Sequence, residues 1–355
     1  MKILAPVDSA KEAAILMKAG AEELFCGYIP NDWKNEYQTF YGERTQTQET
    51  TELLTVSLNK RNNLEGNVSF EDELKKIVSL AKKENVKIFV TLNAFYYTQC
   101  MYAYLKKYIA RLVEIGVYGF IVTDVGLIGF IKENFPDVYI VLSCCNQVAN
   151  RSSAAFFSKI GVNRITFPRH VTLEEITEIC SSLPNVKFEC FILDARCIYD
   201  DGNCRAIHNL GHFCMDQWEY ETFHSCKYLK DISYDEIQAV RENEKKFTEW
   251  TKPYLSQDGK YNGWFPISCS ACAVPILKAC TNMISLKIAG RGLNTISKIM
   301  MVRAAKKMIN ISEELPRNEA ILKEREYISN LVGIPQMCEN QSRCLMPSRY
   351  YSNLL

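Results

Sequence analysis

A group of thiols and imidazoles is the part of this sequence best suited to chemistry. It begins in the stretch DARCIYDDGNCRAIHNLGHFCMDQWEY, from Asp194 to Tyr220, which has neither helical nor strand periodicity. Thiolates are preferred ligands of iron–sulfur clusters and zinc, and a cysteine beside a base can act as a nucleophile. This stretch and the residues after it hold the following candidates: Cys197, Cys204, Cys214, Cys226, Cys269, Cys272, Cys280, His208, His212 and His224.

The spacing of these residues leaves the cofactor open. Dispersed cysteines suit a [4Fe–4S] cluster, whose ligands need not come in C-x-x-C pairs. Zinc is favoured instead by the H-x₃-H spacing of His208 and His212 and by the CSAC segment at 269–272. A metal-free site, with Cys197 or Cys204 activated by His208, is a third interpretation. A conventional peptidase is thinly supported, because neither G-x-S-x-G nor H-E-x-x-H occurs.

Composition narrows the class of protein. The 355 residues include 42 basic and 41 acidic side chains, for a formal net charge of +1. That balance argues against a protein that neutralises many phosphates, so we do not expect a nucleic-acid partner. We see no signal peptide and no apolar stretch long enough to span a bilayer, and therefore expect a cytoplasmic protein without membrane contact. There the 15 cysteines should not form a disulfide framework. Five of them lie in or beside apolar runs and are expected in the core: Cys26, Cys144, Cys145, Cys180 and Cys190.

The elements that must position these residues alternate regularly. Helix-length amphipathic segments separate eight short apolar runs, a pattern typical of parallel strands buried on both faces. Eight such units predict a (β/α)₈ barrel of the TIM type, and no G-x-G-x-x-G follows the first run. The expected strands are 2–7, 23–28, 86–93, 118–124, 138–144, 163–168, 186–193 and 284–290, and the expected helices are 10–19, 70–84, 102–115, 125–134, 151–160, 173–182 and 294–308.

The chain then divides around one long insertion. Residues 1–193 would carry the first seven strands, and residues 194–283 would form a cysteine-rich, cofactor-binding insertion between strands seven and eight. Residues 284–308 would complete the barrel, and residues 309–355 would form a C-terminal tail. In a barrel this insertion emerges at the carboxyl ends of the strands, where active sites of the fold lie.

Polar residues just past the strand ends are the remaining catalytic candidates. Arg169 and Arg291 could clamp a carboxylate, although Arg169 could equally cap a helix or pair with a nearby glutamate. Asp124 could orient a substrate hydroxyl, but N-capping of the next helix is the stronger interpretation. Lys287 could be a reactive buried amine or could pair with a neighbouring acid. The full set of candidates at this end of the barrel is Asn93, Asp124, Ser143, Gln147, Arg169, Lys287 and Arg291, with His208 from the insertion.

Several collinear segments resemble the collagenase-like peptidase family U-32, in the branch that contains iron–sulfur, oxygen-independent hydroxylases. The resemblance covers about residues 2–301, and its order along the chain is more specific than any one motif. CIYDDGNC resembles the C-x₆-C element of the family, and ILAPVDSAKEAAILMKAGAEELFCG is similar to its opening segment. The other matching segments are VTLNAF, FIVTDVGLI, VLSCCNQVANRSSAAFF, RITFPRHVTLEEI and CAVPILKACTNMISLKIAGRG.

The resemblance implies a barrel-type fold and, as in several members, a [4Fe–4S] cluster held by four cysteines. Residue by residue it implies Cys197, Cys204, Cys214 and Cys269 as ligands, with Cys272 and Cys226 as alternatives for the fourth. Members hydroxylate a ubiquinone precursor ring or bases in transfer and ribosomal RNA without oxygen, and prephenate is implicated as hydroxyl donor for some. The chain departs from the pattern at Asn203 and Ala289, where the family has arginine and glutamate.

These observations lead to one favoured function and three alternatives. We expect an iron–sulfur enzyme that hydroxylates a small molecule, or modifies it by related redox chemistry, with a prephenate-like carboxylate donor. The first alternative is hydroxylation of an RNA base, which a basic surface around the barrel mouth would favour. The second is a zinc or metal-free peptidase or hydrolase. The third is a non-catalytic cluster-binding partner that works in a complex with a second family member.

Overall fold

The computed structural model describes residues 1–38, 58–60, 66–194, 268–332 and 344–346, with Gly202 and four further single positions. The chain divides into two compact units. One comprises Met1–Arg205 and Phe265–Leu355, and the other comprises Ala206–Trp264. Nearly all described residues belong to the first unit, and the fold below is the fold of that unit. Residues 268–283, the last part of the predicted insertion, also belong to it.

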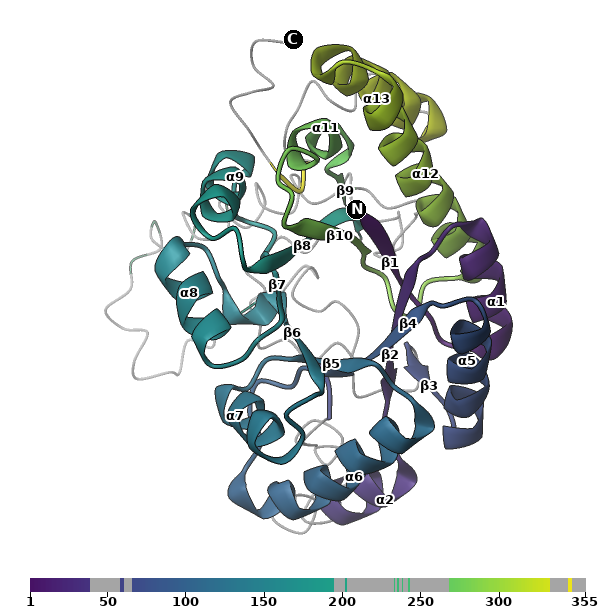
Figure 1. The fold of residues 1–355 in the computed structure, drawn as a ribbon, viewed down its shortest axis with the longest axis vertical. Coiled ribbons are helices and arrows are strands. Elements are labelled where there is room, and N and C mark those ends of the chain that lie inside the picture. The colour runs from purple at the N-terminus through teal and green to yellow at the C-terminus, as the bar shows by residue number, and fades with distance from the viewer. Residues whose placement is uncertain are drawn as a thin grey trace. The chain divides into compact units, whose positions relative to one another are not determined.

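Eight parallel strands of the described chain close into a barrel (Figure 1). Neighbours pair in the order β1-β10-β8-β7-β6-β5-β4-β2, and pairing of β1 with β2 completes the ring. This confirms the predicted (β/α)₈ class and all eight predicted strand positions. The barrel strands are β1 Lys2–Pro6, β2 Glu23–Tyr28, β4 Lys87–Leu92, β5 Gly119–Val122, β6 Tyr139–Leu142, β7 Arg164–Thr166, β8 Lys187–Asp194 and β10 Met283–Ile288.

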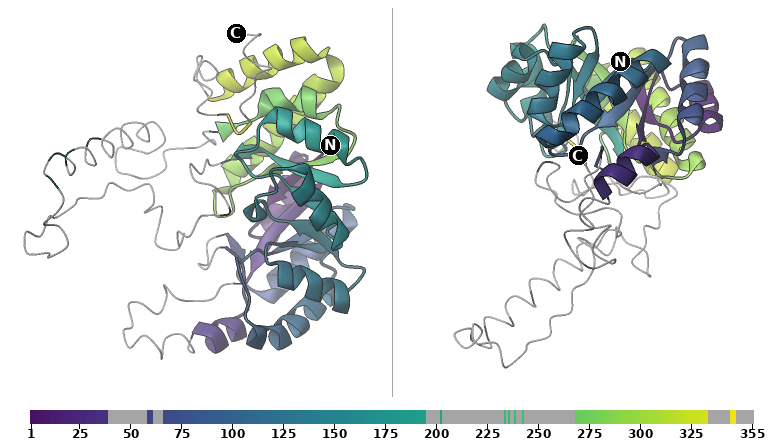
Figure 2. Two further views of the ribbon diagram at one scale, coloured as in Figure 1. Left: turned by 90° about the vertical axis from the view of Figure 1, so that its left-hand side faces the viewer. Right: turned by 90° about the horizontal axis from the view of Figure 1, so that it is seen from below.

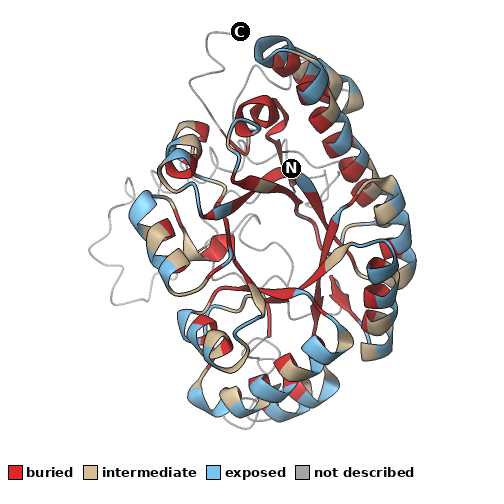
Figure 3. Ribbon diagram, viewed as in Figure 1, coloured by how far each residue is buried: buried red, intermediate tan, exposed pale blue. Residues whose placement is uncertain are grey.

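Helices cover the outside of the barrel and turn their apolar faces to the strands (Figure 3). Side-chain caps mark the first residues of α1, α7, α8, α9 and α12. In α1, for example, Ser9 accepts a hydrogen bond from the Glu12 amide, and Gly20 ends the helix in the left-handed conformation. The helices are α1 Ala10–Ala19, α2 Asn31–Trp33, α5 Glu71–Lys83, α6 Tyr102–Ile115, α7 Val125–Asn134, α8 Arg151–Lys159, α9 Leu173–Ser182, α11 Val274–Leu277, α12 Thr295–Glu314 and α13 Arg317–Val332.

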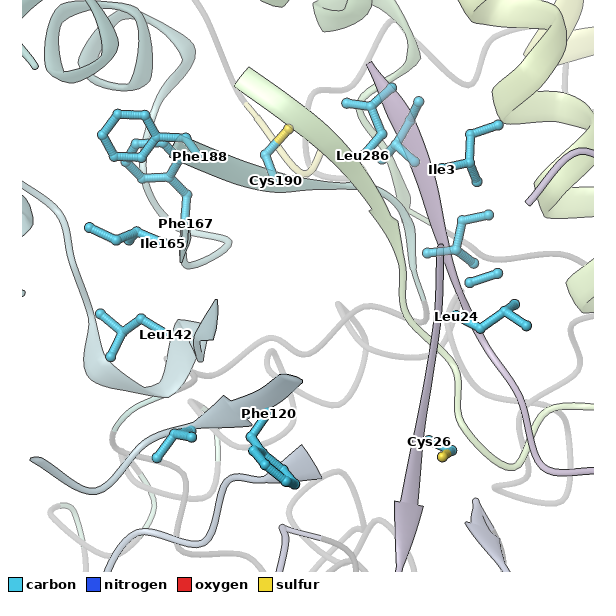
Figure 4. Close-up of a cluster of buried hydrophobic side chains, with 14 of the residues drawn as sticks. Ile3, Leu24, Cys26, Phe120, Leu142, Ile165, Phe167, Phe188, Cys190 and Leu286 are labelled. Carbon is cyan, nitrogen blue, oxygen red and sulfur yellow. The ribbon is translucent and has the colours of Figure 1, made fainter. Parts of the chain in front are cut away.

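Two cores follow from the alternation of side chains along each strand. The larger core lies between strands and helices, where Figure 4 shows side chains such as Phe188 and Leu286 on the outer side of the barrel wall. All five cysteines predicted to be core residues are buried. The smaller core fills the barrel itself and consists of Leu4, Phe25, Phe89, Ile121 and Val141.

Three short elements add to the barrel. Strand β3 (Asn67–Val68) extends the edge of β2, and β9 (Ser268–Cys269) pairs antiparallel with the end of β8. A single parallel β-bridge, a pairing of backbone groups, joins Cys269 to Cys344 near the end of the chain. Figure 2 shows the barrel from the side, with α12 and α13 packed as a pair along its outer surface. These additions bring residues far apart in the sequence to the carboxyl end of β8.

Candidate active site at the barrel mouth

Polar side chains gather at the carboxyl ends of the strands, which we call the barrel mouth. Because the barrel strands are parallel, these ends open on one side, where enzymes of this fold keep their active sites. Some of these polar residues lie in the last part of a described strand or soon after it, and others form hydrogen bonds with such residues. The full set is Asp8, Asn59, Lys60, Asn67, Thr91, Asn93, Asp124, Ser143, Gln147, Arg169 and Arg291.

Arg291 is the most tightly held cation of these described residues. Its side chain is only 7% exposed, and Nη1 donates to Thr91 Oγ1 at 2.9 Å and to Asn59 Oδ1 at 3.2 Å. Asn59 Nδ2 in turn donates to Asn67 Oδ1 at 2.9 Å. Gly27 makes room for this cluster, since a Cβ there would lie 2.6 Å from Arg291 Nη1 and even closer to Asn67 Oδ1. The guanidinium is therefore fixed before any ligand arrives.

Acidic groups behind the mouth hold the Arg291 loop in place. Asp8 Oδ2 accepts from the Gly292 amide at 3.2 Å and from Lys298 Nζ at 2.5 Å, and Lys298 also donates to Glu12 at 3.0 Å. Nearby, burial raises the pKa of the Cys26 thiol to about 12, with Asp8 adding to the effect and Arg291 opposing it. Cys26 is therefore an inert core thiol rather than a nucleophile.

Asn93 joins a short segment of the chain to the rim of the mouth. Its Oδ1 accepts from the Lys60 backbone amide at 3.2 Å. Lys60 Nζ then lies 3.8 Å from the Cys145 sulfur. Asn93 therefore satisfies a backbone group at the barrel mouth, and the contact places a lysine and a thiol beside the predicted site.

Asp124 caps a helix, as its position suggested. Its Oδ1 accepts from the Leu127 amide at 2.6 Å, at the start of α7. Ser143 similarly accepts from the Cys145 amide at 3.4 Å. Both side chains therefore shape the loops at the mouth, and the structure brings neither against Arg291.

Lys287 and Arg164 form a buried ionic network inside the barrel. Lys287 Nζ lies 3.3 Å from Glu189 Oε1 and near the faces of Phe25 and Phe191. Arg164 bridges Glu23, at 2.6 and 2.9 Å, to Glu189 at 3.0 Å. Burial opposes ionisation of Glu189, but Lys287 and Arg164 outweigh it and hold the pKa of its carboxyl below the usual value. Pairing with an acid was one of the two roles expected for Lys287.

Arg169 lies against an apolar patch at the mouth. Its guanidinium carbon is 4.2 Å from the centroid of the Phe191 ring. Phe191 packs with Cys144, Cys145 and Leu345 in a small buried cluster. Leu345 comes from the C-terminal tail, and its backbone amide donates to the Cys269 carbonyl at 2.9 Å. The tail therefore reaches the candidate site, which the sequence left undecided.

Two observations bear on where a [4Fe–4S] cluster would fit. Cys269 is buried on β9 and pairs with Leu193 at the carboxyl end of β8. Gly202, which lies between Cys197 and Cys204 in the sequence, packs so closely on Gln147 that a Cβ would fall 2.5 Å from Gln147 Nε2. The described Cys269 and Gly202 thus both lie near the barrel mouth.

The described residues do not form a metal site by themselves. Within the ranges that the structure describes, no three His, Cys, Asp or Glu side chains are grouped closely enough to hold an ion. Cys272 is buried in the turn after Cys269. The predicted Cys197, Cys204, Cys214, Cys226 and His208 lie outside the described residues.

Sequence reasoning missed several residues of the mouth. Asn59, Lys60 and Asn67 lie at the end of a polar stretch rich in Thr, Gln and Asn, about residues 31–67, that predicted a loop with a short helix. One feature of the sequence could have identified these residues. The polar stretch follows the apolar strand β2 and therefore begins at the mouth of the barrel. Thr91 was missed because it lies within an apolar strand, where its hydroxyl reaches Arg291.

The barrel and its mouth belong to a known family. The sequence profile of peptidase family U32 matches residues 8–334, almost the whole chain. The chain is therefore a member of peptidase family U32, as the collinear motifs predicted.

Segments of this chain are similar to proteins whose names refer to tRNA hydroxylation. A 105-residue segment is 35% identical to the tRNA hydroxylation protein P of Escherichia coli (strain K12) and covers 29% of this chain and 23% of that protein. A 160-residue segment is 29% identical to the tRNA hydroxylation protein P1 of Bacillus subtilis (strain 168) and covers 43% and 37%. The alignments thus span well under half of these relatives. A solved U32 peptidase structure matches with 15% identity and a TM-score of 0.40, over 54% of this chain and 69% of that one.

The comparisons correct our expectation of a small-molecule substrate and of no nucleic-acid partner. The relatives named above act in tRNA hydroxylation, so the RNA alternative is the better supported one. The prediction failed because net charge averages over the whole chain and says little about the local field at one mouth. The expectation of hydroxylase-type chemistry agrees with the same names. No described helix is long and apolar enough to cross a membrane.

Proposed function

We propose that this chain hydroxylates a base in RNA, with tRNA as the expected substrate class. The observation that carries the proposal is the match of family U32 to almost the whole chain, together with relatives named for tRNA hydroxylation. A closed barrel with a fixed arginine, a lysine and several thiols at its mouth is suited to such a reaction. The peptidase name of the family has no comparable support from the described residues.

The predicted cofactor of this reaction is a [4Fe–4S] cluster held by Cys197, Cys204, Cys214 and Cys269. Such a cluster would supply redox chemistry or activate the donated hydroxyl group. The family resemblance favours this cofactor over zinc, and the described Cys269 lies at the carboxyl end of β8.

Arg291 is the residue best placed to hold a carboxylate-bearing hydroxyl donor. It is buried, always charged, and oriented by Thr91 and Asn59, so it loses little freedom when it pairs with an anion. Arg169 stacks on Phe191 at the same mouth and is the second candidate for this role. The donor expected from the family resemblance is prephenate-like.

The proposal is tested by nucleoside analysis of RNA from cells with and without the gene. Loss of the gene should remove one hydroxylated nucleoside, and its precursor, lighter by one oxygen atom, should accumulate. The wild-type chain should restore the nucleoside, whereas Arg291→Lys should restore it poorly, because lysine loses the planar two-pronged contact. Lys307→Arg, an exposed change on α12, is the matched control.

Cofactor content is measured on the same proteins after anaerobic purification. We expect broad absorption near roughly 400 nm and about four iron and four sulfide per chain, reduced in Cys197→Ala and Cys269→Ala. Zinc in place of iron would overturn the cofactor assignment. RNA nucleosides that do not change on deletion of the gene would overturn the function.

A further inference from the structure

Two neighbouring aromatic rings stand exposed at the rim of the barrel mouth. Phe95 is 38% exposed and Tyr96 is 56% exposed, in the loop that follows β4 and leads to α6. Single exposed apolar side chains are common on protein surfaces. Here, however, two aromatic residues adjacent in the sequence follow Asn93 with only Ala94 between them, at the carboxyl end of a barrel strand. We refer to Phe95 and Tyr96 as the aromatic pair.

The backbone that carries the aromatic pair is anchored on both sides. Tyr97 is buried, and its hydroxyl donates to the Leu58 carbonyl at 2.7 Å. Asn93 accepts from the Lys60 amide at 3.2 Å. The segment 58–60 is thus fastened along the loop at two points. The two rings are therefore presented on a held backbone, which lowers the entropy that a ligand must overcome.

The aromatic pair is continuous with the candidate active site. Lys60 Nζ lies 5.3 Å from the centroid of the Phe95 ring and 3.8 Å from the Cys145 sulfur. Cys145 belongs to the buried cluster with Phe191, against which Arg169 lies. One lysine therefore links an exposed ring to the interior of the mouth. Its positive charge also suits the neighbourhood of a polyanion.

We propose that the aromatic pair is a stacking platform for unpaired RNA bases that flank the base being modified. The inference rests on the proposed function, because it assumes an RNA substrate at this mouth. A base that enters an enclosed site must leave its stack, and its neighbours then lose a stacking partner. Exposed aromatic side chains commonly replace that partner in single-stranded RNA. Stacking is tolerant of base identity, so the pair would select unpaired structure rather than sequence.

The test measures RNA binding by full-length variants, so it does not depend on turnover. The probes are fluorescently labelled bulk tRNA from cells lacking the gene, and a short single-stranded RNA that contains 2-aminopurine. Tyr96→Ala should weaken binding of both probes by about fivefold or more. Tyr96→Phe should bind like the wild type, because it keeps the ring. Phe95→Ala should also weaken binding, and wild-type protein should quench 2-aminopurine fluorescence through stacking.

Phe156→Ala is the matched control, since Phe156 on α8 is 51% exposed and does not follow a strand end. It should leave binding unchanged. If wild-type protein binds neither RNA, the proposed function is wrong. If wild type binds both and the two alanine variants bind equally well, the platform is wrong while the RNA activity stands. Equal losses in Tyr96→Phe and Tyr96→Ala would also exclude stacking as the cause.

Discussion

At the scale of single residues, Arg164 shows how charge can be buried without a ligand. It lies at the start of β7, almost fully shielded, between the carboxylates of Glu23 and Glu189. Burial alone would lower the pKa of the guanidinium, but Glu23 and Glu189 outweigh burial and raise it. The side chain therefore remains charged and is shared between two acids inside the barrel, with Lys287 supplying a second positive charge to Glu189.

Replacing Arg164 with methionine should destabilise the fold by about 3–5 kcal/mol, because a buried acid loses its partner. Denaturant unfolding of the wild type and Arg164→Met measures this loss. Arg111→Met is the control, since Arg111 makes an equally close pair with Glu71 in exposed positions and should matter little. Adding Glu23→Gln to Arg164→Met should recover part of the stability. A variant as stable as the wild type would show that the network contributes nothing.

Strand and helix positions were readable from sequence, and the polar contacts between them were not. Each barrel strand appeared as an apolar run because both of its faces are buried, and the Asp124 cap followed from its place before α7. The contact of Asn59 with Arg291 joins residues 232 positions apart in the chain. No local pattern encodes such a contact, since it depends on how the closed barrel brings loops together.

At the scale of elements, the contact between α12 and α13 contains a carboxyl that should make stability depend on pH. Glu324 is fully buried and accepts from Ser312 at 2.7 Å, and burial raises its pKa from 4.5 to about 8, with Ser312 opposing. The protonated form therefore stabilises the helix pair below about pH 4.5, and this contribution is lost as the pH rises through about 8.

Glu324→Gln should consequently raise the thermal stability at pH 9 and have little effect at pH 4. Glutamine keeps the shape of the protonated acid and has no charge to bury. The gain at high pH should reach a few kcal/mol, at about 1.4 kcal/mol for each unit of pKa difference. Unfolding curves at pH 4, 7 and 9 measure it, with exposed Glu319→Gln on the same helix as control. A gain that is independent of pH would contradict the assigned titration.

At the scale of the whole molecule, the last described part of the chain returns to the barrel mouth. Residues 344–346 lie beside β9, where the backbone of Cys344 forms a β-bridge with that of Cys269, and Leu345 packs on Cys144, Cys145 and Phe191. Leu345 is nearly inaccessible to solvent. This contact could not be predicted, because a single leucine in an irregular tail has no periodicity that could assign it to the core.

Leu345→Ser should therefore expose the side chains beneath the tail at the barrel mouth without unfolding the barrel. It removes the apolar contact that holds the tail, while the barrel strands keep their own cores. We expect faster alkylation of Cys144 and Cys145, read peptide by peptide with mass spectrometry, at an unchanged rate for the core thiol Cys26. Leu322→Ser, a change at a half-exposed leucine on α13, should alter none of these rates. If all three thiols react faster together in Leu345→Ser, the tail supports the whole fold instead of closing its mouth.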